Sequence, residues 1–214
     1  MKTKYHIGFD PSFTAFGISI IDEVRKEITF NQFSSSIDKH STLSKFNAIK
    51  DLRRQVYEFL FGFKVDGDYK ISYGIEVTTV YTGYFALELY ALDFHIYDYF
   101  SSIFYVDTYL YSPSTITKVT GHKSSAKEKT IFLIEDQVIP LFEKYGYKID
   151  KMVEADTKEV KVGNRWKRRR TITDGEADSF IYALHRFCEE SENYALKNEL
   201  LSLLPKLLDV NVLG

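Results

Sequence analysis

The chain has 214 residues, a formal net charge of −2, 44% hydrophobic residues and 27% charged residues, a balance that is typical of a folded domain with a substantial core and excludes a disordered chain. The single cysteine, Cys188, excludes an internal disulfide framework and a cysteine-rich zinc site. Apolar runs are short and residues 1–4 lead directly into a strand pattern, so neither a membrane span nor a signal peptide is predicted, and we expect a cytoplasmic protein.

The first part of the chain predicts a three-stranded antiparallel meander. Residues 4–10, 15–22 and 27–33 alternate loosely or run apolar, with polar turns between them. Residues 43–61 carry apolar side chains at helical spacing, which predicts a helix. Residues 70–77 follow as a short, strongly apolar fourth strand.

The rest of the chain predicts helices that alternate with strands. Helices are predicted at residues 84–100 and 124–145, a fifth strand at 103–110, and a hairpin at about 153–172 that turns at Gly163-Asn164. Thr173-x-x-Glu176 is a capping box that begins a final core helix. Glu176 is therefore expected to serve the helix backbone and not a metal.

These elements predict an α/β fold with one main domain. The fourth and fifth strands each follow a helix, so they join the meander most easily as parallel neighbours through crossover connections. The fold class is a mixed five-stranded sheet, three strands antiparallel and two parallel, flanked by helices. The main domain covers residues 1–188 with the hairpin at about 153–172 as an insertion, and residues 189–214 form a C-terminal helical tail.

Acidic residues stand where several of these elements begin or end. Asp10 closes the first strand, Glu76 closes the fourth, and the final helix opens with Asp174 and Asp178, which share one helix face at a spacing of four. The carboxyl ends of the first and fourth strands are expected to lie side by side. Because Mg²⁺ and Mn²⁺ prefer oxygen ligands, this pattern predicts a carboxylate pocket for a divalent metal.

Basic residues gather in two stretches although the net charge is negative. Residues 158–170 contain seven basic residues and one acid, and Lys118, Lys123, Lys127 and Lys129 surround Gly121-His122. Such patches can follow a phosphate backbone whatever the overall charge. The alternative is a solvated hairpin face and a solvated helix end.

The chain resembles the RuvC-type Holliday junction resolvases of the RNase H-like superfamily, especially their shorter phage and viral members. The resemblance rests on Gly8-Phe9-Asp10-Pro11-Ser12 with Thr14-Ala15-Phe16-Gly17, on Ile75-Glu76, and on residues 121–127 and 174–183. It implies metal binding by Asp10, Glu76 and Asp178, with Asp174 as the fourth ligand, and two Mg²⁺ or Mn²⁺ ions as cofactors.

The resemblance also implies contacts to DNA. Lys127 fits the place of a basic residue at the scissile phosphate, with Lys123 or Lys129 as alternatives. Tyr81 stands near the place of a stacking aromatic residue, although a core or surface tyrosine is the alternative reading. The DNA-binding set that we expect is Lys118, Lys123, Lys129, Arg165, Lys167, Arg168, Arg169, Arg170 and Tyr81.

In the family pattern, the second of the last two acids follows the first by three residues. Here Asp178 follows Asp174 by four residues, and Gly175 stands where the family pattern has its first acid. A charge that favours the helix dipole is the alternative role for Asp174.

The expected function is resolution of four-way DNA junctions by metal-dependent phosphodiester hydrolysis with symmetric nicks, without a nucleotide cofactor. Two-fold symmetric cutting calls for a homodimer, and the resemblance places its contact on the aromatic helix at 84–100. The leucine-rich residues 196–208 are either a second dimer contact or a cover for the chain's own surface. The alternatives are an RNase H-like nuclease for flaps or Y-forks, and a junction-binding protein without activity. The host cell cytoplasm is the expected location if a phage encodes the chain.

Overall fold

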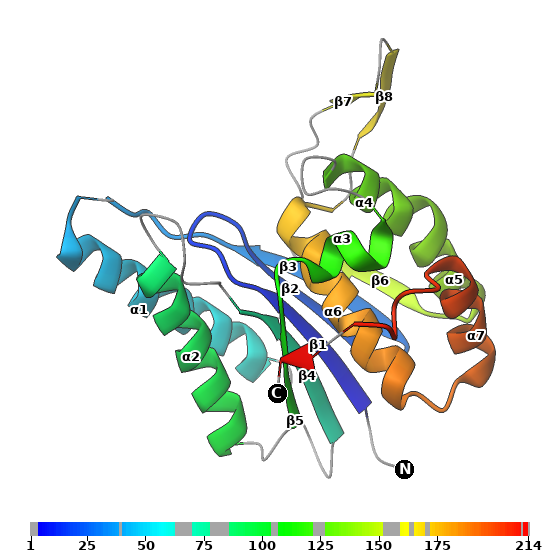
Figure 1. Cartoon of the computed structure of the whole chain (residues 1–214), viewed down its shortest axis with the longest axis horizontal. Helices are drawn as coiled ribbons and strands as arrows, with labels where there is room; N and C mark the ends of the chain where they lie inside the picture. Colours follow the sequence, from blue (N-terminus) through cyan, green and yellow to red (C-terminus); the bar gives the residue numbers. More distant parts are fainter. Residues whose placement is uncertain are drawn as a thin grey trace.

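A computed structural model of the chain describes residues 4–38, 40–62, 70–77, 86–103, 107–121, 127–151, 159–162, 165–169, 172–210 and 212–213. Within these ranges the main sheet has seven strands in the order β6-β3-β2-β1-β4-β5-β9 (Figure 1). The strands are β1 (Lys4–Asp10), β2 (Phe16–Asp22), β3 (Glu27–Phe33), β4 (Lys70–Glu76), β5 (Asp107–Tyr111), β6 (Lys148–Lys151) and β9 (Val212–Leu213).

The strand directions confirm the predicted mixed sheet. β2 runs antiparallel to β1 and β3, whereas β4 is parallel to β1 and β5 is parallel to β4. The order β3-β2-β1-β4-β5 therefore contains the three antiparallel and two parallel strands that the sequence predicts. The number of strands is corrected from five to seven, because β6 pairs in parallel with β3 at one edge and β9 pairs antiparallel with β5 at the other.

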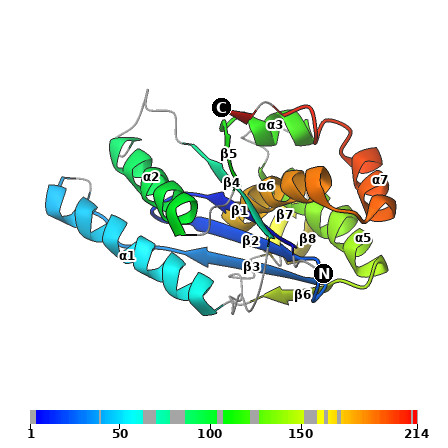
Figure 2. The same cartoon turned by 90° about the horizontal axis from the view of Figure 1, so that it is seen from below.

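Helices cover both faces of the sheet. α1 (Thr42–Gly62) and α2 (Ala86–Ile103) pack on one face, and α6 (Asp174–Glu190) crosses the other (Figures 1 and 2). α3 (Thr115–Thr120), α4 (Lys127–Leu133), α5 (Ile139–Lys144) and α7 (Tyr194–Leu203) lie on the α6 side. None of the helices in the described ranges is long and apolar enough to cross a membrane.

The side chains of the central strands alternate between the two faces, as period-two geometry requires. In β1, Tyr5, Ile7 and Phe9 enter the core beneath α1 and α2. His6 lies against the α6 residue Phe187, with ring centroids 5.5 Å apart. By the same alternation, Gly8 and Asp10 face α6. In β4, Tyr73 faces the core beneath α1 and α2, whereas Gly74 and Glu76 face α6.

Two predicted elements have different bounds in the structure. α2 continues to Ile103 and β5 begins only at Asp107, so the predicted strand at 103–110 starts too early. The predicted helix at 124–145 is divided into α4, a π-helical turn at Ile134–Val138, and α5. Pro140 stands in the first turn of α5, and because proline cannot donate to the carbonyl four residues before it, the regular helix is interrupted there.

The basic hairpin forms a sheet of its own. β7 (Glu159–Val162) pairs antiparallel with β8 (Arg165–Arg169), on either side of residues 163–164, which lie outside the described part of the chain. Figure 1 shows the hairpin standing away from the main sheet. A separate basic hairpin agrees with the predicted element at about 153–172.

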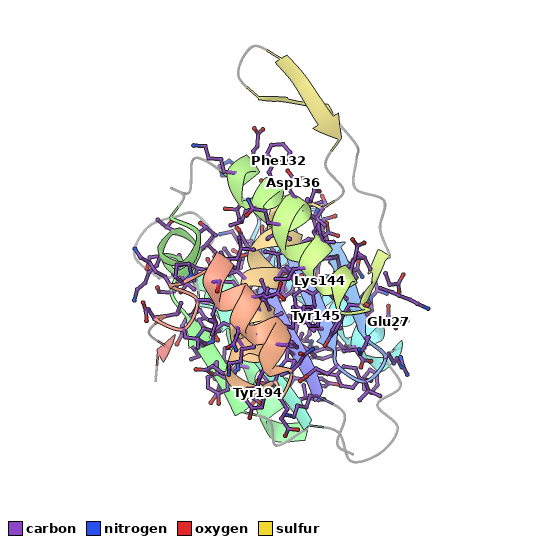
Figure 3. All side chains as sticks on the ribbon, turned by 90° about the vertical axis from the view of Figure 1, so that its right-hand side faces the viewer. Glu27, Phe132, Asp136, Lys144, Tyr145 and Tyr194 are labelled. Atoms are coloured by element: carbon purple, nitrogen blue, oxygen red, sulfur yellow. The ribbon has the colours of Figure 1, made fainter. Side chains whose placement is uncertain are left out.

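The C-terminal tail covers the chain's own core, which is one of the two roles expected for it. Leu196, Leu200, Leu204 and Leu207 are buried in the cluster that includes the inner face of α6. Lys144 Nζ lies 2.8 Å from both carboxylate oxygens of Glu199, which ties α5 to α7. Figure 3 labels Lys144 and its neighbour Tyr145.

Candidate active site

Glycines let α6 lie directly on the central strands. A Cβ atom at Gly8 would overlap the carbonyl oxygen of Ser179, and one at Gly17 would overlap the carbonyl of Gly175. The absence of these side chains therefore permits the close backbone approach. Between the two contacts, Ser19 Oγ lies 2.7 Å from Ser179 Oγ, a buried hydrogen bond that fixes the helix over the sheet.

The strand register places two of the predicted acids at one end of the sheet. Phe9 of β1 lies opposite Ile75 of β4, so Asp10 and Glu76 follow as the next residues of two adjacent parallel strands. Both side chains are half-buried and both face the α6 side. The register thus brings together the strand-borne acids that the sequence predicted as neighbours.

A capping box fixes the start of α6. The Glu176 amide donates to Thr173 Oγ1 at 3.2 Å, and the Thr173 amide donates to Glu176 Oε2 at 2.6 Å. This confirms that Glu176 serves the backbone. It also fixes Asp174 in the first helical turn and Asp178 one turn further along.

Tyr182, one turn beyond Asp178, is a residue that the sequence reasoning missed. Its side chain is fully buried, and its hydroxyl donates to Glu76 Oε2. Burial, together with the charges of Glu76, Asp10 and Asp178, raises the pKa of Tyr182 well above its usual value. Three of the four predicted acids therefore act on one buried hydroxyl. The available signal was the spacing of four from Asp178, which places Tyr182 on the same helix face.

An acid at position 175, three residues before Asp178, is excluded by contact. Gly175 is buried, and a Cβ atom there would overlap the carbonyl oxygen of Ala15. The position must remain glycine for α6 to reach the β1–β2 turn. Asp174 is half-buried in the first turn, where its charge also favours the helix dipole.

The donor chemistry of these acids fits a hard divalent cation, because each offers only carboxylate oxygens. Their present arrangement is more open than a formed metal site. Among the residues that the structure describes, no three His, Cys, Asp or Glu side chains form a group that could hold one ion. One carboxylate oxygen of Glu76, Oε2, accepts a hydrogen bond from the Tyr182 hydroxyl.

The predicted basic residues have separate placements. Lys118 lies on α3, and its ammonium donates to the carbonyl of Asp209 at 2.6 Å. Lys129 is exposed on α4, and Lys127 is the first residue of that helix. β8 contains Arg165, Lys167, Arg168 and Arg169, whereas Lys123, Arg170 and Tyr81 lie outside the described residues.

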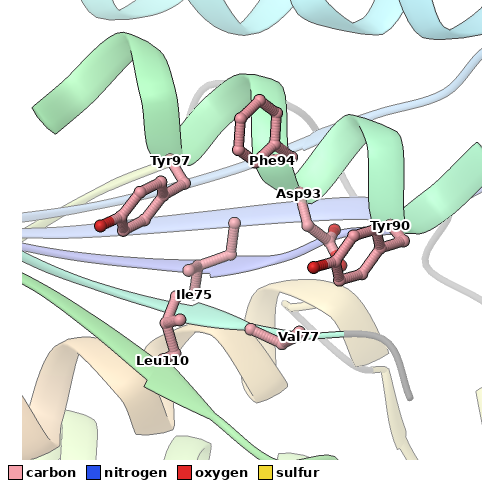
Figure 4. A pocket seen from close by; sticks show the side chains of 7 residues that line it. All are labelled: Ile75, Val77, Tyr90, Asp93, Phe94, Tyr97 and Leu110. Carbon is pink, nitrogen blue, oxygen red and sulfur yellow. The ribbon is translucent and has the colours of Figure 1, made fainter. Parts of the chain in front are cut away.

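An apolar pocket lies on the opposite face of the sheet. Figure 4 shows residues of α2 above residues of β4 and β5, and the pocket has a volume of about 190 Å³. It is lined by Ile75, Val77, Tyr90, Asp93, Phe94, Tyr97 and Leu110. Because Ile75 faces away from α6, this pocket is separate from Asp10 and Glu76. The α2 side chains that line it are exposed: Tyr90, Phe94 and Tyr97 have exposed fractions of 47%, 56% and 38%.

No protein-family model matches the chain, and no curated protein matches it. Among solved structures, the chain is similar to Thermus thermophilus RuvC in complex with a Holliday junction substrate, with 12% identity, a TM-score of 0.47, and coverage of 100% of both chains. A second structure of Thermus thermophilus RuvC has 13% identity and a TM-score of 0.42, and the alignment covers 98% of this chain and 99% of that one.

Proposed function

We propose that the chain is a metal-dependent endonuclease that resolves four-way DNA junctions. The observation that carries the proposal is the register that ends β1 and β4 with Asp10 and Glu76 side by side, with Glu76 hydrogen-bonded to Tyr182 of α6, one turn beyond Asp178. Asp10, Glu76 and Asp178 are the proposed metal ligands, and Asp174 is the fourth. The sequence motifs that contain these acids support the choice of a resolvase.

Bound Mg²⁺ or Mn²⁺ would supply an activated water and neutralise the phosphate and the leaving oxygen. The residues of the chain hold and orient the reactants. Asp10 and Glu76 are only half-buried at the end of the sheet, so a phosphate can approach them. Lys127 and Lys129, at the start of α4, are proposed to contact the scissile or adjacent phosphates.

The hairpin is proposed to add sequence-independent DNA contacts. β8 carries four basic residues in a strand of five, Arg165, Lys167, Arg168 and Arg169. A strand of this composition, standing away from the main sheet, suits a phosphate backbone better than a protein core.

Symmetric incision requires two active sites, and we propose a homodimer formed through α2. The outward face of this helix exposes large apolar side chains, including Leu87 at 70% and Phe94 at 56%. Such a patch is typical of an interaction surface. Phe94→Glu is expected to shift the protein toward monomer in sedimentation velocity. Tyr194→Glu is the control, because Tyr194 is 67% exposed but lies on α7; an equal effect of both changes would contradict this interface.

The function is tested with a labelled synthetic four-way junction in Mg²⁺ or Mn²⁺, beside a Y-fork, a flap and a linear duplex. Paired symmetric nicks in the junction that disappear in Asp10→Asn are the expected result. Preferential cutting of forks or flaps would support the metal site but would show that the substrate is a branched DNA other than the four-way junction. Junction binding without cleavage in either metal would leave a binding protein and refute the catalytic proposal.

A further inference from the structure

The hydrogen bond from Tyr182 to Glu76 joins two elements that meet only through the fold. Glu76 ends β4, and Tyr182 lies in the middle of α6. The Tyr182 hydroxyl donates to Oε2 of Glu76, and the tyrosine side chain has an exposed fraction of 0%. The chemistry proposed above does not use this hydroxyl.

The Tyr182 ring packs against a neighbouring aromatic ring. It stacks on Tyr111 of β5 with ring centroids 5.0 Å apart and an interplanar angle of 27°. The Tyr111 hydroxyl bonds elsewhere, because it lies 2.7 Å from Nδ1 of the buried His185. The backbone beneath is fixed, because Ser179 of the same helix packs against Gly8. The ring stack and the close helix backbone together hold the Tyr182 hydroxyl beside Glu76.

The chemistry around the hydroxyl suits a donor that carries no charge. Asp10, Glu76 and Asp178 all act on this group. A neutral hydroxyl can fix one carboxylate oxygen without cancelling the negative charge that a cation needs. A lysine at the same place would neutralise that charge, and a phenylalanine would leave the carboxylate without this donor.

We infer that Tyr182 is a positioning residue for Glu76: its hydroxyl fixes one carboxylate oxygen so that the acid is oriented toward the divalent cation. This inference rests on the proposed function, since it assigns Glu76 to a metal. Metal-ligating carboxylates are commonly oriented by hydrogen bonds from surrounding residues, and loss of such a partner typically weakens metal binding by about 10–100-fold.

The test is calorimetric titration of the DNA-free protein with Mn²⁺ alone. Tyr182→Phe keeps the ring and its stack on Tyr111 and removes only the hydroxyl. It is expected to weaken Mn²⁺ binding by roughly 10–100-fold. Tyr111→Phe is the matched control, because it removes a buried hydroxyl from the same stack that bonds His185 and not an acid. Its Mn²⁺ affinity is expected to equal that of the wild type.

A double mutant separates positioning from a general structural effect. If Tyr182 acts through Glu76, adding Tyr182→Phe to Glu76→Gln is expected to cause no further loss of Mn²⁺ affinity. Unchanged or tighter binding by Tyr182→Phe, equal losses in both phenylalanine variants, or a further loss in the Glu76→Gln background would overturn the inference and leave the proposed function standing. Absence of Mn²⁺ binding by the wild type would overturn both.

Discussion

Replacing Gly8 with alanine tests whether the contact between α6 and the sheet is as close as the structure has it. The added Cβ would overlap the Ser179 carbonyl oxygen and would lie 2.7 Å from the Ala183 nitrogen. Both obstacles are backbone atoms, which cannot rotate away as a flexible side chain can. Overpacking of a core typically costs about 1–3 kcal/mol, and a backbone obstacle places Gly8→Ala at the upper end, near 3 kcal/mol.

The assay is urea unfolding of Gly8→Ala beside Gly62→Ala. Gly62 ends α1, and a Cβ atom there meets no atom within 4 Å. Gly62→Ala is therefore expected to be neutral or to gain up to about 1 kcal/mol. For a chain of this length, a loss of 3 kcal/mol corresponds to a fall in Tm of roughly 6–12 °C. Gly8→Ala that is as stable as the wild type, or equal losses in both variants, would refute the close contact.

Other predictions concern a buried ion pair, a buried histidine and the basic hairpin. Arg186, 1% exposed, pairs with Glu189 and Glu190; Arg186→Ala is expected to lower the free energy of unfolding by about 3–5 kcal/mol in urea, and a loss below 1 would contradict the buried pair. Burial lowers the pKa of His185 to about 4, so the unfolded chain, whose histidine has a pKa near 6.5, takes up the proton first on acidification. Stability is then expected to fall by about 3 kcal/mol as the pH drops from about 6.5 to 4, and the fall should shrink in His185→Gln; equal pH profiles would contradict it. Lys167→Ala is expected to reduce the salt-dependence slope of junction binding by about 0.9, whereas an unchanged slope would show that this residue contacts no phosphate.

The central strands and the strand-borne acids were predictable because local pattern and topology agree. Tyr5, Ile7 and Phe9 alternate with smaller or polar residues, which fixes both the strand and its buried face. The crossover through α1 then makes β4 a parallel neighbour of β1, so Asp10 and Glu76 had to lie at the same end of the sheet. The capping box at Thr173 is equally local, and the structure confirms it.

Features that depend on distant contacts were not predictable in this way. β6 and β9 have four and two residues, too few for a periodic signal, and exist because β3 and β5 offer open edges. The need for Gly175 is set by the Ala15 carbonyl, which is remote in sequence. From the sequence alone, Tyr182 is expected to be one more buried residue of a core helix. Its hydrogen bond to Glu76 exists only because the fold places the end of β4 beside α6.

The position of α6 also sets the order in which the chain can fold. β1 and β2 are synthesised first and α6 is among the last elements. The sheet face that α6 covers therefore stays exposed while most of the chain is synthesised. Contacts between segments so far apart slow folding. The centre of that face carries Gly8, Gly17 and Ser19, whereas Ile21 of β2 and Ile28 and Phe30 of β3 place large apolar side chains beside it on the same face. The small residues that admit α6 thus make only the centre of this face poor in apolar surface, and Ile21, Ile28 and Phe30 stay without their α6 partners until that helix is made.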